Sequence, residues 1–277
     1  MGCMTMIPKM LVGLVLAAMA FPLCAQNGGE PPLPSLDSIL HRVLERVEKE
    51  SENDRQFNAQ YIYSRTKRTE TRNAQGELKK KEEQTKEHNP TVVRATFRAQ
   101  SNKPTPQPRS DGGQTPPGTN ATSSVRGKAF EKSDFPLDDD LLKRYKFTLV
   151  GRETRNGRPT LVLDFVPASK NLPERNIKDR FINKAAGRAW VDEADAAVVK
   201  ADLHLTEKVS VAGGLVGALW KFNFKFNREH LPDSLWFTRD TDWHLEGREF
   251  FIRKNMDYHE ERNDVRAARA AGLSQAE

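Results

Sequence analysis

Trp220-Lys-Phe-Asn-Phe-Lys-Phe-Asn227 is the most informative segment of the sequence. Aromatic residues alternate with Lys and Asn at a strict period of two, so a β-strand places every ring on one face. Full burial of each ring is worth about 1.5–3 kcal/mol, so the protein's own elements or an apolar ligand must cover this face. The stretch therefore predicts a half-buried strand around which the core is built.

The residues that follow predict two further strands with the same apolar face. Arg228–Asp233 has the composition of a hairpin loop, and Glu246-Gly247 that of a second, two-residue turn. In this register Phe226 pairs with Leu235, and Phe224 pairs with Phe237. The residues of the two new strands that share the apolar face are then Leu235, Phe237, Trp243, Phe250, Ile252, Met256 and Tyr258. Agreement among three strands supports the assignment more strongly than one strand could.

Arg239 and Lys254 break this pattern, because the same register puts them side by side on the apolar face near Phe222. One interpretation is that a bulge or a strong twist turns them outward, or that they lie at the rim of the sheet. The other is a cationic spot inside an apolar concavity, suited to a carboxylate or phosphate head on an acyl chain.

Residues 1–25 have the features of a secretory signal peptide. Lys9 precedes an apolar run over Met10–Phe21, which is shorter than the ~20 residues of a membrane-spanning helix, and a small-residue cleavage site follows. We expect a cleaved leader and a periplasmic protein; lipid attachment at Cys24 and an uncleaved anchor are the alternatives. Because Cys3 and Cys24 are the two cysteines of the chain, the mature protein must hold its core without disulfides.

Changes in composition predict the domain plan. Proline-rich residues 26–34 predict a linker, and Pro-, Gly-, Ser- and Thr-rich residues 100–129 predict a disordered insertion. Apolar periodicity predicts a single domain over residues 35–263, followed by a flexible tail over 264–277.

Several elements of this domain can be predicted individually. Residues 36–50 have the apolar spacing of a helix, which we expect to dock on the aromatic face. The charged stretch 59–88 predicts a hairpin whose second strand is a solvated sheet edge. Asn156-Gly157 is the strongest hairpin signal, and a further hairpin is expected from strands at 187–192 and 198–207. A short strand is also expected at 92–97, and a short helix or turn at 138–145.

Composition and motifs favour a binding protein over an enzyme. The formal net charge of +6 is spread among acidic residues and forms no clustered stripe typical of nucleic-acid binding. The sequence lacks G-x-S-x-G, a P-loop, G-x-G-x-x-G and H-E-x-x-H. His204 and His244 share polar strand faces with acids, where a metal pair or simply exposed histidines would fit. We therefore expect no catalysis, no cofactor and no metal.

Three segments carry a resemblance to known proteins: Lys146–Pro167 (KFTLVGRETRNGRPTLVLDFVP), Gly187–Leu205 (GRAWVDEADAAVVKADLHL) and Trp220–Tyr258. The second segment starts with G-x-x-W-V-D and returns with V-V-K-A-D. These segments resemble the paired strands of the outer-membrane lipoprotein-sorting superfamily, the LolA/LolB-like proteins, and of the related sigma-factor regulator RseB. The resemblance covers residues 135–262 well and the N-terminal part by element order.

This resemblance implies a mainly β (α+β) fold: a strongly curved antiparallel sheet forming an unclosed half-barrel, with the N-terminal helix and short helices over its concave face. It also implies non-catalytic binding of acyl chains or lipidated proteins in the periplasm. The charged hairpin at 59–88 and the insertion at 100–129 depart from the family pattern and leave room for another apolar cargo.

We therefore expect a monomeric periplasmic carrier of lipids or lipoproteins. The residues expected to contact its ligand are Trp220, Phe222, Phe224, Phe226, Phe237, Trp243, Ile252 and Met256, with Arg239 and Lys254 at the head group. A second hypothesis is a regulatory or structural module that binds envelope proteins, as RseB does, without lipid cargo. If the helix at 36–50 fills the aromatic face completely, that face is ordinary core.

Overall fold

The computed structural model describes residues 31–90, 137–211, 214 and 216–268, and the compact unit that contains the sheet begins at Leu33. The expected leader, the strand at 92–97 and the insertion at 100–129 lie outside the described residues. No helix among the described residues is both long and apolar enough to cross a membrane.

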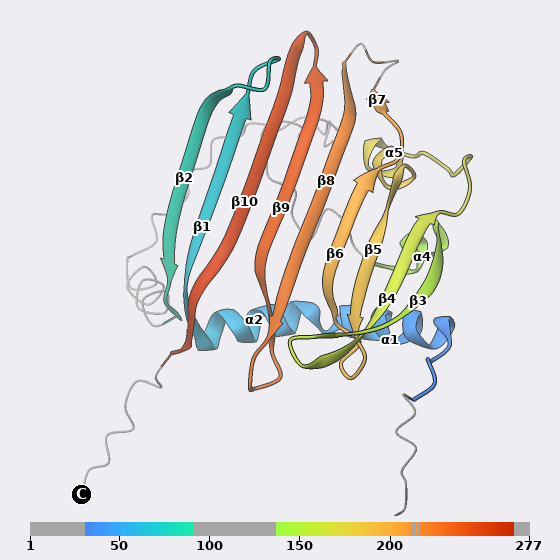
Figure 1. The fold of residues 1–277 in the computed structure, drawn as a ribbon, viewed down its shortest axis with the longest axis vertical. Helices are drawn as coiled ribbons and strands as arrows, with labels where there is room; N and C mark the ends of the chain where they lie inside the picture. Colours follow the sequence, from blue (N-terminus) through green and yellow to red (C-terminus); the bar gives the residue numbers. More distant parts are fainter. Residues whose placement is uncertain (1–30, 91–136, 212–213, 215, 269–277) are drawn as a thin grey trace, which may run out of the picture. The chain divides into compact units, whose positions relative to one another are not determined.

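An open antiparallel sheet dominates the described part of the chain (Figure 1). Its strands are β1 (Tyr61–Arg72), β2 (Leu78–His88), β3 (Tyr145–Arg155), β4 (Arg158–Pro167), β5 (Ala185–Asp192), β6 (Val198–Leu205), β7 (Val209–Val211), β8 (Gly217–His230), β9 (Trp236–Glu249) and β10 (Ile252–Ala267). Their order is β2-β1-β10-β9-β8-β6-β5-β4-β3, with β7 paired to β8 beside this path. Because the edge strands β2 and β3 do not pair with each other, the barrel stays open, and the expected mainly β half-barrel is confirmed.

The helices of the described part are α1 (Leu36–Glu48), α2 (Glu50–Gln60), α4 (Asp139–Lys143) and α5 (Ile177–Ile182). Ser35 caps α1, and its side chain accepts a hydrogen bond from the backbone N–H of Ser38 at 3.3 Å. In Figure 1, α1 and α2 run across one end of the sheet. We call the face that these helices and α5 cover the helix-side face, and the opposite one the outer face.

The helix α1 forms as expected but docks elsewhere. Its buried residues Ile39 and Val43 pack against Leu161, Leu163 and Val191 of β4 and β5. The expectation that this helix covers the aromatic stripe is therefore wrong. The centre of the stripe is covered instead by α5, whose buried Phe181 and Ile182 join the same cluster as Phe222.

Two local predictions are confirmed by the backbone. Asn156 and Gly157 join β3 to β4 with φ of 49° and 75°, as a type I′ turn requires. The strand β2 is an almost wholly exposed edge, and Lys80 and Lys81 on it form ion pairs with glutamates of the same strand. β10 continues to Ala267, past the point at which we expected the tail to begin.

Candidate functional site

The helix-side face of β8, β9 and β10 carries a continuous group of aromatic rings. Phe222 is 1% exposed, and its ring meets that of Phe181 edge-on at a centroid distance of 5.0 Å. Trp243 of β9 stacks on Tyr258 of β10 at 5.1 Å, and Phe224 pairs with Trp243 across the ladder. Three neighbouring strands therefore share one apolar face, as the alternation indicated.

The register within this face differs from the predicted one. Phe224 lies opposite Trp243, not Phe237, and Phe226 lies opposite Thr241, not Leu235. The cause is a later turn: β8 continues to His230 and β9 begins at Trp236, so residues 231–235 form the connection in place of Arg228–Asp233. A bulge between Asn227 and Arg228 shifts the pairing further.

The second turn is also displaced. β9 runs through Glu246-Gly247 to Glu249, and the chain reverses at Phe250 and Phe251. Gly247 serves close packing rather than a turn, because a Cβ there would lie 2.6 Å from the backbone oxygen of Ala218. Consequently Met256 pairs with Leu245 and not with Phe237.

The sequence-predicted ligand residues divide between several places. Met256 packs on the cluster of Phe222 and Trp243, and Phe226 lies beside Phe224 with ring centroids 6.0 Å apart. Phe237 belongs to a separate cluster, where it stacks on Phe57 of α2 at 5.2 Å. The helix α2 was not predicted, and neither was this aromatic contact.

Trp220 and Ile252 lie outside the aromatic clusters. A bulge between Leu219 and Lys221 gives Leu219 the inward position and leaves Trp220 37% exposed, with the guanidinium of Arg253 at 5.6 Å from its ring. Ile252 is 65% exposed beside the β9–β10 turn.

Arg239 and Lys254 do not lie side by side. Arg239 is the extra residue of the bulge in β9, and its exposed guanidinium forms an ion pair with Glu229. Lys254 pairs with Gly247 near the end of the sheet, and its ammonium lies 3.6 Å from the carboxylate of Glu249. This arrangement matches the first interpretation, in which a bulge and the rim of the sheet accommodate the two cations.

A different cationic cluster, which the sequence did not reveal, lies on the helix-side face. Its centre is the carboxylate of Glu260, which is 2.8 Å from Arg65, 3.4 Å from Lys67 and 3.3 Å from Arg262. The hydroxyl of Tyr258 donates to the same carboxylate at 2.6 Å. We call Arg65, Lys67, Glu260 and Arg262 the Glu260 cluster; its three cations and one anion leave two positive charges in excess.

The surroundings of Glu260 keep it ionised. Burial opposes its charge, but hydrogen bonds from Arg65 and Tyr258 outweigh burial and hold the pKa of the carboxyl below its usual value. Burial and the bond to Glu260 raise the pKa of Tyr258, so this hydroxyl remains a donor. The cluster could be inferred from sequence only with the β1–β10 register in hand, since its members are nearly 200 positions apart.

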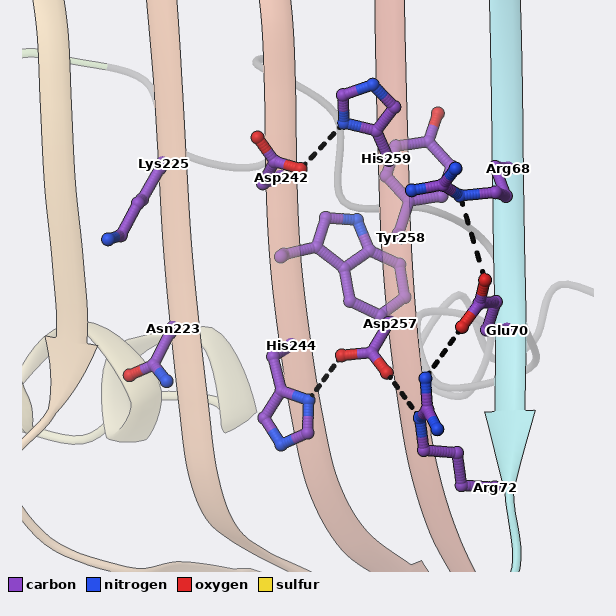
Figure 2. A pocket seen from close by; sticks show the side chains of 11 residues that line it. Arg68, Glu70, Arg72, Asn223, Lys225, Asp242, His244, Asp257, Tyr258 and His259 are labelled. Atoms are coloured by element: carbon purple, nitrogen blue, oxygen red, sulfur yellow. Dashed lines mark hydrogen bonds and ion pairs between the residues drawn. The ribbon is translucent and has the colours of Figure 1, made fainter. Parts of the chain in front are cut away.

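The outer face of the same strands is polar and contains a shallow hollow of about 470 Å³. Figure 2 shows His244 pointing toward Asp257, and Asp257 toward Arg72. The two contacts are 2.6 Å and 2.9 Å long, and a second imidazole, His259, contacts Asp242 at 2.7 Å. Each histidine is thus engaged by a carboxylate. The described residues include no group of three or more side chains arranged to hold a metal ion.

Comparisons with known proteins return structural likenesses only. No protein-family model and no curated protein matches the chain. A domain assigned to outer membrane lipoprotein sorting, from Vibrio parahaemolyticus, is 15% identical over 84% of this chain and 95% of that chain, with a TM-score of 0.33. A LolA superfamily protein from Nitrosomonas europaea is 11% identical over 83% and 93%, with a TM-score of 0.30. The MucA/MucB complex from Pseudomonas aeruginosa matches at 10% over 84% and 100%, with a TM-score of 0.25.

The first two carry the superfamily name that the sequence segments resemble. With TM-scores below 0.5, these likenesses support no statement about ligand or partner, which therefore has to come from the side chains.

Proposed function

We propose that this chain is a non-catalytic binding protein of the cell envelope that holds an acyl chain on the helix-side face of its sheet. The features of residues 1–25 support export to the periplasm. The ligand class that fits best is an amphiphile with an acyl chain and an anionic head, such as a lipid or the lipid anchor of a protein.

One observation carries this proposal: a partly exposed aromatic ring lies between small side chains and the Glu260 cluster. In a single row across the sheet, Ala189 pairs with Ala201, Ala201 with Phe226, Phe226 with Thr241, and Thr241 with Glu260. Phe226 and both alanines are partly exposed, and Phe226 belongs to none of the buried clusters of the described residues. An apolar chain along the alanines would cover Phe226 and remove its surface from water.

The Glu260 cluster supplies the complementary charge. Arg65 and Lys67 are 37% and 38% exposed while Glu260 is 12% exposed, so the cations are more accessible than the carboxylate that they surround. Guanidinium and ammonium groups bind carboxylate and phosphate through charge-assisted hydrogen bonds. We therefore assign the head-group contact to the Glu260 cluster and no longer to Arg239 and Lys254. Ion pairs hold those two side chains at the bulge and at the rim of the sheet.

The second candidate function is a module that binds an envelope protein, and the outer hollow is the observation that favours it. Charged side chains of both signs line it, including Arg68, Arg72, Lys225 and Asp242. Such a lining suits a charged peptide segment better than an acyl chain.

A fluorescent fatty acid, 11-dansylundecanoic acid, tests the proposed function. The purified protein should enhance and blue-shift its emission on binding, and dodecyl phosphate should displace it better than dodecanol. Phe226→Glu should weaken probe binding about tenfold or more by placing an unpaired carboxylate against the chain. Arg65→Gln should reduce the preference for dodecyl phosphate over dodecanol.

Two further variants make the test specific. Ala201→Leu should also weaken binding, because it fills the space beside Phe226 without adding charge. Val166→Ser removes a 48% exposed apolar group from the outer face of β4 and should leave binding unchanged. Absence of binding by the wild type, or equal binding by Phe226→Glu in a protein with unchanged circular dichroism, would overturn the proposal.

A further inference from the structure

Exposed apolar side chains gather at one end of the sheet, around the β9–β10 turn. They are Val216 (42% exposed), Trp220 (37%), Phe250 (55%), Phe251 (98%) and Ile252 (65%). We call these five residues the tip. Its parts are connected, because the N–H of Phe250 donates to the oxygen of Val216 at 2.9 Å and Gly217 pairs with Glu249. Figure 1 shows this turn at the end of the sheet away from α1 and α2.

The residues of the β9–β10 turn are unfavourable for a turn that faces water. Phe250 has a φ of 51°, a conformation that favours glycine and asparagine over bulky residues. Phe251 exposes almost its whole ring. Contiguous exposed apolar groups of this kind mark a surface that binds another surface.

Cations flank the tip and identify the chemistry of its partner. Arg248, Arg253 and Lys254 lie within residues 248–254, where Glu249 is the only acid, so this segment has a net charge of +2. Arg253 lies over the ring of Trp220. Aromatic rings next to basic side chains fit the interface of a bilayer, where rings enter the head-group region and cations meet anionic lipid.

We propose that the tip docks the protein onto a membrane surface that contains anionic lipid. Phe250, Phe251 and Ile252 enter the interface, and the net positive charge of residues 248–254 attracts the anionic lipid. The helix-side face then lies outside the bilayer, and the end of the sheet that carries the tip points toward the membrane. This proposal needs no acyl cargo, since the tip and Phe226 lie in different parts of the sheet.

Vesicle binding and tryptophan fluorescence test the proposal. Protein should sediment with vesicles of phosphatidylcholine and phosphatidylglycerol, less with phosphatidylcholine alone, and less again at high salt. Trp190, Trp236 and Trp243 are at most 8% exposed, so Trp220 is the tryptophan free to report contact. Its emission should shift to the blue and be quenched by brominated acyl chains, and Trp220→Phe should remove both signals.

Phe251→Ser should weaken vesicle partitioning about tenfold or more, with no change in folding because the ring makes little contact. Val166→Ser is the control at an exposed apolar site outside the tip and should bind as the wild type does. Phe226→Glu should also bind vesicles normally, which separates this proposal from the acyl-binding site.

Sedimentation unchanged by Phe251→Ser, or no vesicle binding at all, would overturn the proposal. So would concentration-dependent self-association abolished by Phe251→Ser, because it would assign the tip to a second copy of the chain.

Discussion

Phe181 of α5 packs edge-on against Phe222 of β8, with ring centroids 5.0 Å apart and an interplanar angle of 79°. This contact fixes a six-residue helix on the helix-side face and buries the strand's central ring. We predict that Phe222→Ala lowers the free energy of unfolding by about 3–5 kcal/mol, because it leaves a cavity under α5. Urea denaturation followed by circular dichroism measures this. Phe251→Ala should cost under about 0.5 kcal/mol, and an equal cost at both sites would contradict the packing described.

A buried ion pair joins α2 to β8. The carboxylate of Glu50 lies 2.8 Å from the guanidinium of Arg228, and their side chains are 8% and 6% exposed. We predict that Glu50→Ala costs about 3–5 kcal/mol of stability, because it leaves the buried cation without this partner. The double variant Glu50→Met/Arg228→Met should recover most of that loss. A double variant as unstable as the single one would show that packing rather than charge determines the cost.

Gly187 lies where the chain has no space for a side chain. A Cβ there would be 2.1 Å from the backbone oxygen of Asp202 and 2.8 Å from the ring of Phe165. Gly187→Ala should therefore destabilise the sheet by about 1–3 kcal/mol or more through displaced backbone. The matched control is Gly151→Ala, since nothing lies within 4 Å of a Cβ at that position. Thermal unfolding that shifts equally for both variants would rule out this steric explanation.

Acid should lower the free energy of unfolding by protonating Glu246 on the outer face. Hydrogen bonds from His244 and Lys221 lower the pKa of Glu246 from 4.5 to about 2. Between these two values the unfolded chain binds more protons at this group than the folded one does, so stability rises with pH. The stabilisation is present above pH 4.5 and is lost as the pH falls through 2. Urea titrations across this range should give a smaller change in the free energy of unfolding for Glu246→Gln than for the wild type. Identical pH dependence in the two proteins would contradict the assignment.

The aromatic strand face and the Asn156-Gly157 turn could be predicted from the sequence, because each depends on local geometry. A period of two places Phe222, Phe224 and Phe226 on one face whatever their partners are. The register between strands could not be read in the same way. Bulges beside Trp220 and Arg228 shift the pairing by single residues, and no sequence pattern marks them.

Two residues misled the prediction for physical reasons. Gly247 has the composition of a turn, but it is required where β8 approaches β9 closely. The chain turns instead at Phe250, a residue that sequence preference disfavours there.

The helix α5 could have been predicted from its N-cap residue. Asn176 is a favoured N-cap type, and in the structure it accepts a hydrogen bond from the N–H of Asp179. The Glu260 cluster needed the β1–β10 pairing, which only the fold supplies.

Native mass spectrometry of the protein purified from a membrane-containing lysate is the decisive test of acyl binding at Phe226. We expect a bound lipid mass on the wild type that is lost from Phe226→Glu and kept by Val166→Ser. Wild-type protein without a lipid adduct, or an adduct that persists in Phe226→Glu, would contradict it.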